Sequence, residues 1–112
     1  MTESLVMSNH IILFCTCPDQ NTASSIAQTL IGENLAACAN IFPGLTSVYR
    51  WQDQIETDQE CLLLVKTRRD IYPQVEQRIQ EAHPYELPEI VAVSVEHALP
   101  EYLKWIDSCL SK

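Results

Sequence analysis

The order in which strand-like and helix-like segments follow one another is the feature that most constrains the fold of this chain. Strands show short apolar runs or period-two alternation, whereas amphipathic helices repeat apolar residues every three to four positions. The chain reads strand, helix, strand, strand, helix, strand, with a further helix at its end. The expected strands cover residues 11–14, 36–42 with its continuation 46–52, 60–67 and 89–95, with a polar turn at 53–59. The expected helices cover residues 23–31, 69–82 and 100–110.

This βαββαβ order predicts an α+β fold of the ferredoxin-like type, in which an antiparallel sheet carries two helices on one face. A chain of 112 residues is short enough to form one domain. We expect that domain to cover residues 9–112, after a flexible N-terminal tail over residues 1–8.

The expected hairpin over residues 36–67 is longer than this fold requires. Pro43 and Gly44 interrupt its first strand, which predicts a β-bulge or a bend at that point. Beyond the interruption, Tyr49 and Trp51 share one face and extend past the core. Because exposed strand edges invite pairing, we expect a closed homo-oligomer in which these arms cover neighbouring subunits.

Charge and hydropathy exclude two classes of partner. The formal net charge is −8, with 15 acidic against 7 basic residues, which argues against a surface that binds nucleic acid. No apolar run approaches the about 20 residues that a membrane-spanning helix needs. The N-terminal residues also lack the basic and apolar regions of a signal peptide, so we expect a cytoplasmic protein.

Known catalytic signatures are absent from the sequence. The only glycines are Gly32 and Gly44, so the chain has neither a P-loop nor a dinucleotide-binding fingerprint. A catalytic triad would need a histidine as its base, and none of the three histidines lies in a nucleophile-elbow or similar motif. We therefore expect a protein that is not an enzyme.

The chain contains five cysteines, an odd number without the spacing of a disulfide framework. Cys38 and Cys61 lie in strand-like runs and are expected to be small buried hydrophobes. Cys15 and Cys17 differ, because a Cys-x-Cys pair on an extended segment sends both side chains to the same face. Such a pair either binds a soft metal such as Cu(I) or simply packs at the strand end. Structural zinc is disfavoured, because the sequence has no second pair of this kind.

The segment HPYELPE contains a further candidate ligand. The residue before Pro84 is driven out of the helical region, so the preceding helix should end at His83. The negative end of the helix favours a protonated imidazole, whereas a metal ligand must be neutral. Glu86 and Glu89 offer only isolated carboxylates to a hard cation. His83 is therefore either simply the residue that ends the helix or a metal ligand. In the second case the first strand ends nearby, and His83 forms one site with Cys15 and Cys17.

At this point the chain resembles the CutA divalent-cation tolerance family. The resemblance covers roughly residues 10–110 and rests on the motifs FCTCPD, ENLAACANIFPGLTSVYRWQDQIE, ECLLLVKT and HPYELPEIVAVSVEHALPEYLKWI. It implies a homotrimer of ferredoxin-like subunits with long hairpins packed between them, similar to the PII signalling proteins. It also implies a response to metal ions, namely tolerance of copper and other divalent cations.

The resemblance further implies a copper site built from one cysteine and two adjacent histidines. Cys15 matches that cysteine and His83 matches the second histidine, but Ala82 stands in place of the first. Cys17 is an additional thiol, and we expect it to compensate in part and to shift the preference towards Cu(I). The alternative is a PII-like regulatory module that binds a small molecule or a protein partner.

Overall fold

The computed structural model describes residues 9–110, and the expected tail over residues 1–8 lies outside this range. The elements follow in the order β1 (His10–Cys17), α1 (Gln20–Gly32), β2 (Cys38–Trp51), β3 (Gln54–Arg68), the 3-10 turn η1 (Arg69–Ile71), α2 (Tyr72–Ala82), β4 (Val91–Ser94) and α3 (Pro100–Cys109). Within the described range the strands form one antiparallel sheet of order β2-β3-β1-β4. The predicted α+β, ferredoxin-like βαββαβ arrangement with a C-terminal helix is therefore confirmed.

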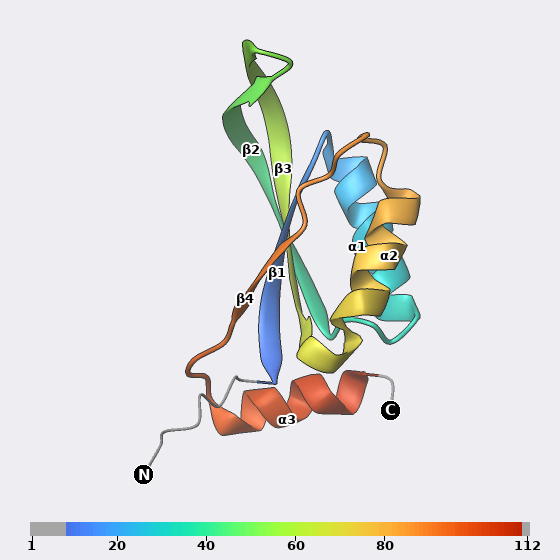
Figure 1. Ribbon diagram of the computed structural model, residues 1–112. Helices are drawn as coiled ribbons and strands as arrows, with labels where there is room; N and C mark the ends of the chain where they lie inside the picture. Colours follow the sequence, from blue (N-terminus) through green and yellow to red (C-terminus); the bar gives the residue numbers. More distant parts are fainter. Residues whose placement is uncertain (1–8, 111–112) are drawn as a thin grey trace.

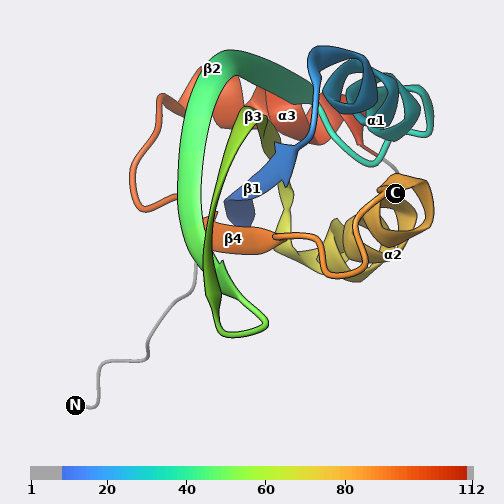
Figure 2. The ribbon, with the colours of Figure 1, turned by 90° about the horizontal axis from the view of Figure 1, so that it is seen from above.

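Helices α1 and α2 lie on the same face of the sheet, and α3 lies across one end of it (Figure 1). The view from above shows the same pairing of α1 with α2 beside β1 (Figure 2). Alternate side chains of β1 are buried, and they face the core shared with these helices. These buried residues are Ile11, Leu13, Cys15 and Cys17. Helix α1 begins where Asp19 Oδ1 accepts a hydrogen bond from Thr22 N at 2.7 Å, so Asp19 caps its N-terminus.

Strands β2 and β3 form a long arm that extends beyond the end of β1 (Figure 1). The register shifts between Phe42 and Leu45, and Gly44 has a φ of 78°, so the predicted bulge is confirmed. The prediction of a polar turn over residues 53–59 is wrong, because residues 54–59 belong to β3. The strands pair up to Trp51 opposite Gln54, because Gln52 and Asp53 alone close the hairpin with left-handed φ values.

The face of the sheet opposite α1 and α2 is mostly apolar. Neither of those helices covers it, and α3 contacts it at one end, where Lys66 and Arg68 contact Tyr102 and Asp107 (Figure 1). The register places alternate residues of all four strands on this face. They include Ile12, Phe14, Phe42, Leu62, Leu64, Val91 and Val93. Phe42 and Val91 are about half exposed, at 51% and 52%. An open apolar sheet face of this kind is typical of a subunit that buries it against other chains.

Two smaller expectations need correction. Cys61 is buried as predicted, but Cys38 is only half-buried, because it begins the edge strand β2. The second helix starts with the short 3-10 turn η1 and becomes α-helical only at Tyr72, next to Pro73. Among the described residues, no helix combines the length and apolarity that a membrane crossing requires.

Candidate metal centre

Three potential metal ligands meet at the end of the sheet where β1 runs towards α1. Cys15 and Cys17 lie at the C-terminal end of β1, and His83 is the residue that caps the C-terminus of α2. One ligand atom from each side chain lies within 4.8 Å of the other two. The cysteines are fully buried and His83 is 8% exposed. The fold thus brings together the three residues that the sequence singled out.

The two thiols interact directly. A hydrogen bond from the Cys15 thiol to Cys17 lowers the pKa of Cys17. The same hydrogen bond, followed by burial and by the negative charges of Glu89 and Glu60, raises the pKa of Cys15. Without a metal, the pair therefore holds on to one of its protons. A cation that binds both sulfurs has to displace that proton.

The imidazole of His83 is held by two backbone groups. Its Nδ1 accepts a hydrogen bond from Tyr85 N at 3.2 Å, so Nδ1 carries no proton. Its Nε2 lies 2.8 Å from Thr16 O and must be the donor in that contact. The ring is thereby set as the neutral tautomer with the proton on Nε2. A metal that binds the ring of His83 has to displace one of these two partners.

Two residues that the sequence did not single out support His83. The ring of Tyr85 lies 4.6 Å from the His83 ring between centroids, tilted by 54°. Its hydroxyl donates to Glu60 Oε2 at 2.6 Å, and Glu60 is only 7% exposed. Burial, followed by the bond to Glu60, raises the pKa of Tyr85, which keeps the phenol protonated as a donor. The position of Tyr85 two residues after His83 was the one available signal.

An acidic cavity of about 580 Å³ adjoins the three ligands through Thr16 and Tyr85. It lies between the outer part of the β2–β3 arm, from Ser47 to Trp51, and the loop that follows α2. Its acidic lining consists of Asp58, Glu60, Glu86 and Glu89, and Arg50 is the one basic residue among those that line it. Glu86 and Glu89 thus line this cavity and do not join the group of three. The negative potential of such a cavity raises the local concentration of cations.

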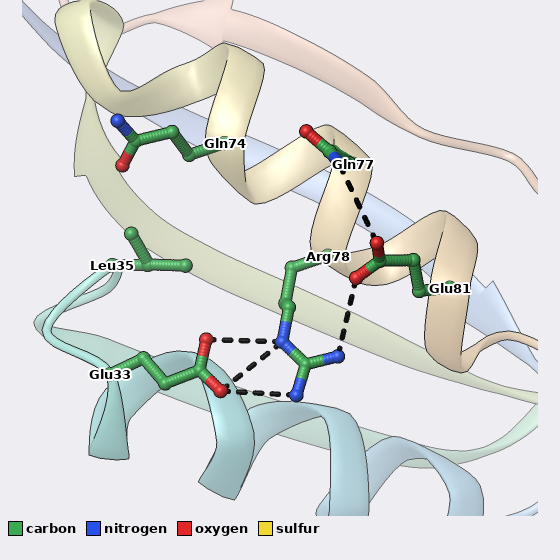
Figure 3. A pocket seen from close by; sticks show the side chains of 6 residues that line it. All are labelled: Glu33, Leu35, Gln74, Gln77, Arg78 and Glu81. Atoms are coloured by element: carbon green, nitrogen blue, oxygen red, sulfur yellow. Dashed lines mark hydrogen bonds and ion pairs between the residues drawn. The ribbon is translucent and has the colours of Figure 1, made fainter.

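A second hollow, of about 340 Å³, lies between the end of α1 and α2 (Figure 3). Arg78 occupies it and binds Glu33 through Nη2 at 3.0 Å and Glu81 through Nη1 at 3.5 Å. The hydrogen bonds from Arg78 also lower the pKa of Glu33. Arg78 is therefore already paired with two carboxylates, and the hollow is the site of an ion-pair link between the two helices (Figure 3).

Comparisons with known proteins agree on one family. The model of the family described as CutA1 divalent ion tolerance protein matches residues 11–109. The divalent-cation tolerance protein CutA of Thermus thermophilus is 47% identical over 95 residues, which cover 85% of this chain and 92% of that protein. Protein CutA of Mus musculus is 40% identical over 83% of this chain, which spans only 52% of the mouse protein.

Solved structures show the same fold. CutA from Xylella fastidiosa superposes with a TM-score of 0.90 at 45% identity, over 93% of this chain and 100% of that chain. A structure from Archaeoglobus fulgidus, described as a periplasmic divalent cation tolerance protein CutA, superposes with a TM-score of 0.88 at 36% identity. That match covers 91% of this chain and 99% of the other.

Proposed function

Because the chain belongs to the CutA1 divalent ion tolerance family, we propose that it serves cation tolerance by binding copper at Cys15, Cys17 and His83. The observation that carries this proposal is the convergence of three buried ligand atoms within 4.8 Å of one another. Two sulfur ligands of one metal lie at most about 4.6 Å apart, given metal–sulfur bonds of about 2.3 Å. The three side chains therefore need only small movements to close on an ion.

The donor set favours Cu(I) over harder cations. Thiolate sulfur is a soft ligand, and two thiols with one imidazole suit Cu(I), whereas Mg²⁺ and Ca²⁺ prefer oxygen. Ala82 supplies no ligand where the family resemblance implies a histidine, and Cys17 supplies sulfur instead. Divalent cations with an affinity for sulfur can use the same ligands. The proposed role is binding, without a catalytic step.

Anaerobic Cu(I) titration against a chromophoric competitor tests this proposal. We expect one Cu(I) per chain, and we expect Cys15→Ser and Cys17→Ser each to weaken binding strongly. Cys38→Ser is the matched control, because Cys38 lies on the edge strand outside the ligand group. Weaker binding in Cys15→Ser but not in Cys17→Ser would remove Cys17 from the site. Unchanged binding in both variants would contradict the proposal.

We further propose that the active form is a homotrimer assembled through the β2–β3 arms, with the PII-like arrangement that the family resemblance implies. The open apolar face of the sheet supports this proposal, as do Tyr49 and Trp51 on the arm, which are 41% and 37% exposed. Trp105 on α3 is also exposed and is a candidate contact. Light scattering should give about three times the subunit mass of 12.7 kDa. A mass near that of one subunit would refute assembly.

The acidic cavity supports a second candidate function, that of a PII-like regulatory module that binds a small molecule. Its volume of about 580 Å³ suits such a ligand. Its four carboxylates favour a cationic ligand over the phosphates of a nucleotide. Calorimetry with small organic cations and with nucleotides, each in the presence of a chelator, separates the two functions. Binding of either class without a metal favours the second function, and the carboxylates predict that the cations bind more tightly.

We also propose a cytoplasmic location, because reduced thiols are the ligands and thiols stay reduced in that compartment. The relative from Archaeoglobus fulgidus is described as periplasmic. Fractionation of cells that produce the present chain tests the location directly, and recovery in the periplasm would refute it.

A further inference from the structure

A third buried thiol lies beside the candidate metal centre. Cys61 in β3 is the residue directly opposite Cys17 in β1. Opposite residues of an antiparallel pair point to the same face of the sheet, and both of these side chains are buried, at 7% and 0% exposure. Both thiols are free. Cys61 does not belong to the group of three ligands.

The register brings this pair within the range of a disulfide. Residues directly opposite in an antiparallel pair have Cα atoms about 4.5 or 5.5 Å apart. Disulfides span Cα separations of about 4.4–6.8 Å. Cys17 is also the last residue of β1, where the strand gives way to the loop before α1. A small adjustment at this strand end is enough to bring the two sulfurs into bonding distance.

The other thiol near Cys17 is less well placed. Cys15 and Cys17 are two residues apart on one strand, which separates their Cα atoms by about 6.6–6.8 Å and points their Cβ atoms in parallel. A disulfide needs Cβ atoms about 3.5–4.5 Å apart, so a Cys15–Cys17 bond would require β1 to leave the sheet. Cys15 instead faces Leu63 across the ladder. The geometry therefore selects Cys61 as the partner of Cys17.

We propose that Cys17 and Cys61 form a reversible cross-strand disulfide when the protein meets hydrogen peroxide, and that this bond withdraws Cys17 from the metal centre. One thiolate attacks an oxygen of the peroxide, whose O–O bond breaks, to give a sulfenic acid and hydroxide. The second thiol then attacks the sulfenic sulfur and releases water. In total, two thiols and one peroxide give one disulfide and two waters, and a dithiol reductant reverses the bond.

The consequence for the metal follows from the ligand count. With its sulfur bonded to Cys61, Cys17 no longer offers a thiolate, and only Cys15 and His83 remain of the group of three. Oxidation would then release the metal, and a bound metal would protect Cys17 from oxidation. This coupling rests on the proposed metal function, whereas formation of the disulfide does not.

Peptide mapping after peroxide treatment tests both parts. Digestion after acidic residues, at Asp19 and Glu33 among others, separates the peptide that carries Cys15 and Cys17 from the one that carries Cys38. Tandem mass spectrometry should find a link between Cys17 and Cys61 that dithiothreitol removes. A Cys15–Cys17 link, a link between two chains, or irreversible oxidation of Cys17 without any link would overturn the proposal.

Two variants and one metal complete the experiment. Cys61→Ser should leave Cys17 without a partner and send it to sulfinic acid, while Cys38→Ser should link as the unaltered protein does. Added Cd(II), a soft ion that peroxide does not oxidise, should suppress the link. A link that forms equally with and without Cd(II) supports the redox pair and contradicts the coupling to a metal. The mapping of the unaltered protein decides the disulfide even if a variant fails to fold.

Discussion

One histidine lies at each end of β1, and the surroundings of the two side chains indicate different roles. His10 at the start of β1 lies 2.9 Å from Asp107 Oδ1 through Nε2, and Arg68 Nη1 lies 3.3 Å from the same oxygen. His83 beside the end of β1 contacts backbone groups and two buried thiols. An ionic network on a protein surface ties α3 to the sheet, whereas a neutral imidazole beside thiols has the chemistry of a soft-metal ligand.

The largest expected effect is on Cu(I) binding, and it tests the contrast between the two histidines directly. His83→Ala should weaken Cu(I) binding by more than the roughly 10- to 100-fold that loss of an outer-shell partner costs, because it removes a ligand. His10→Ala should leave the affinity unchanged. Competition titrations on both variants measure the difference. Equal losses in the two variants would mean that the histidines do not differ in role.

A substitution in α3 should change the stability of the protein and leave its Cu(I) affinity unchanged. Ile106 is 3% exposed where α3 packs against the core. Ile106→Ala should lower the free energy of unfolding by about 2–5 kcal/mol, because it leaves a cavity. Urea unfolding measures this loss. The Cu(I) affinity of the folded variant should stay that of the unaltered protein, and a strong loss of affinity would join the two ends into one functional unit.

A smaller effect is expected at Tyr85, whose backbone and side chain do different things. Tyr85→Phe keeps the N–H that binds His83 and the ring beside it, but it leaves the buried carboxylate of Glu60 without its donor. We expect a loss of about 1–3 kcal/mol in stability with little change in Cu(I) affinity. Tyr72→Phe, which removes a comparable bond to Glu76, is the matched control for the metal assay. A Cu(I) affinity that falls only in Tyr85→Phe would assign the phenol to the metal centre.

The smallest expected effect is on stability at acid pH, and it concerns the ion pair between Arg68 and Asp70 near the start of β1. Hydrogen bonds from Arg68 hold the pKa of Asp70 below its ordinary value of 3.8. A depressed pKa contributes stability above the ordinary value, and that contribution is lost as the pH falls through the lowered one. Asp70→Asn should therefore flatten the acid limb of the stability profile. An acid limb that stays the same in Asp70→Asn as in the unaltered protein would argue against the ion pair.

The sequence predicted the order of the elements, because apolar periodicity in β1, α1 and α2 reports burial. It failed on the outer half of the arm, where residues 53–59 are polar but still pair across the hairpin. Alternation along β1 was enough to place Cys15 and Cys17 on one face. The approach of His83 to those thiols, and its neutral tautomer, depend on how α2 returns to the sheet and on Tyr85 N, which no local pattern reports.

X-ray absorption spectroscopy of the Cu(I)-loaded protein tests the central claim most directly, because it reads the ligands of the metal itself. The three side chains predict a coordination shell of two sulfurs and one nitrogen. The nitrogen should disappear in His83→Ala and one sulfur in Cys17→Ser. A shell made of oxygen and nitrogen alone, or one that survives both substitutions unchanged, would contradict the assignment of the metal to this end of the sheet.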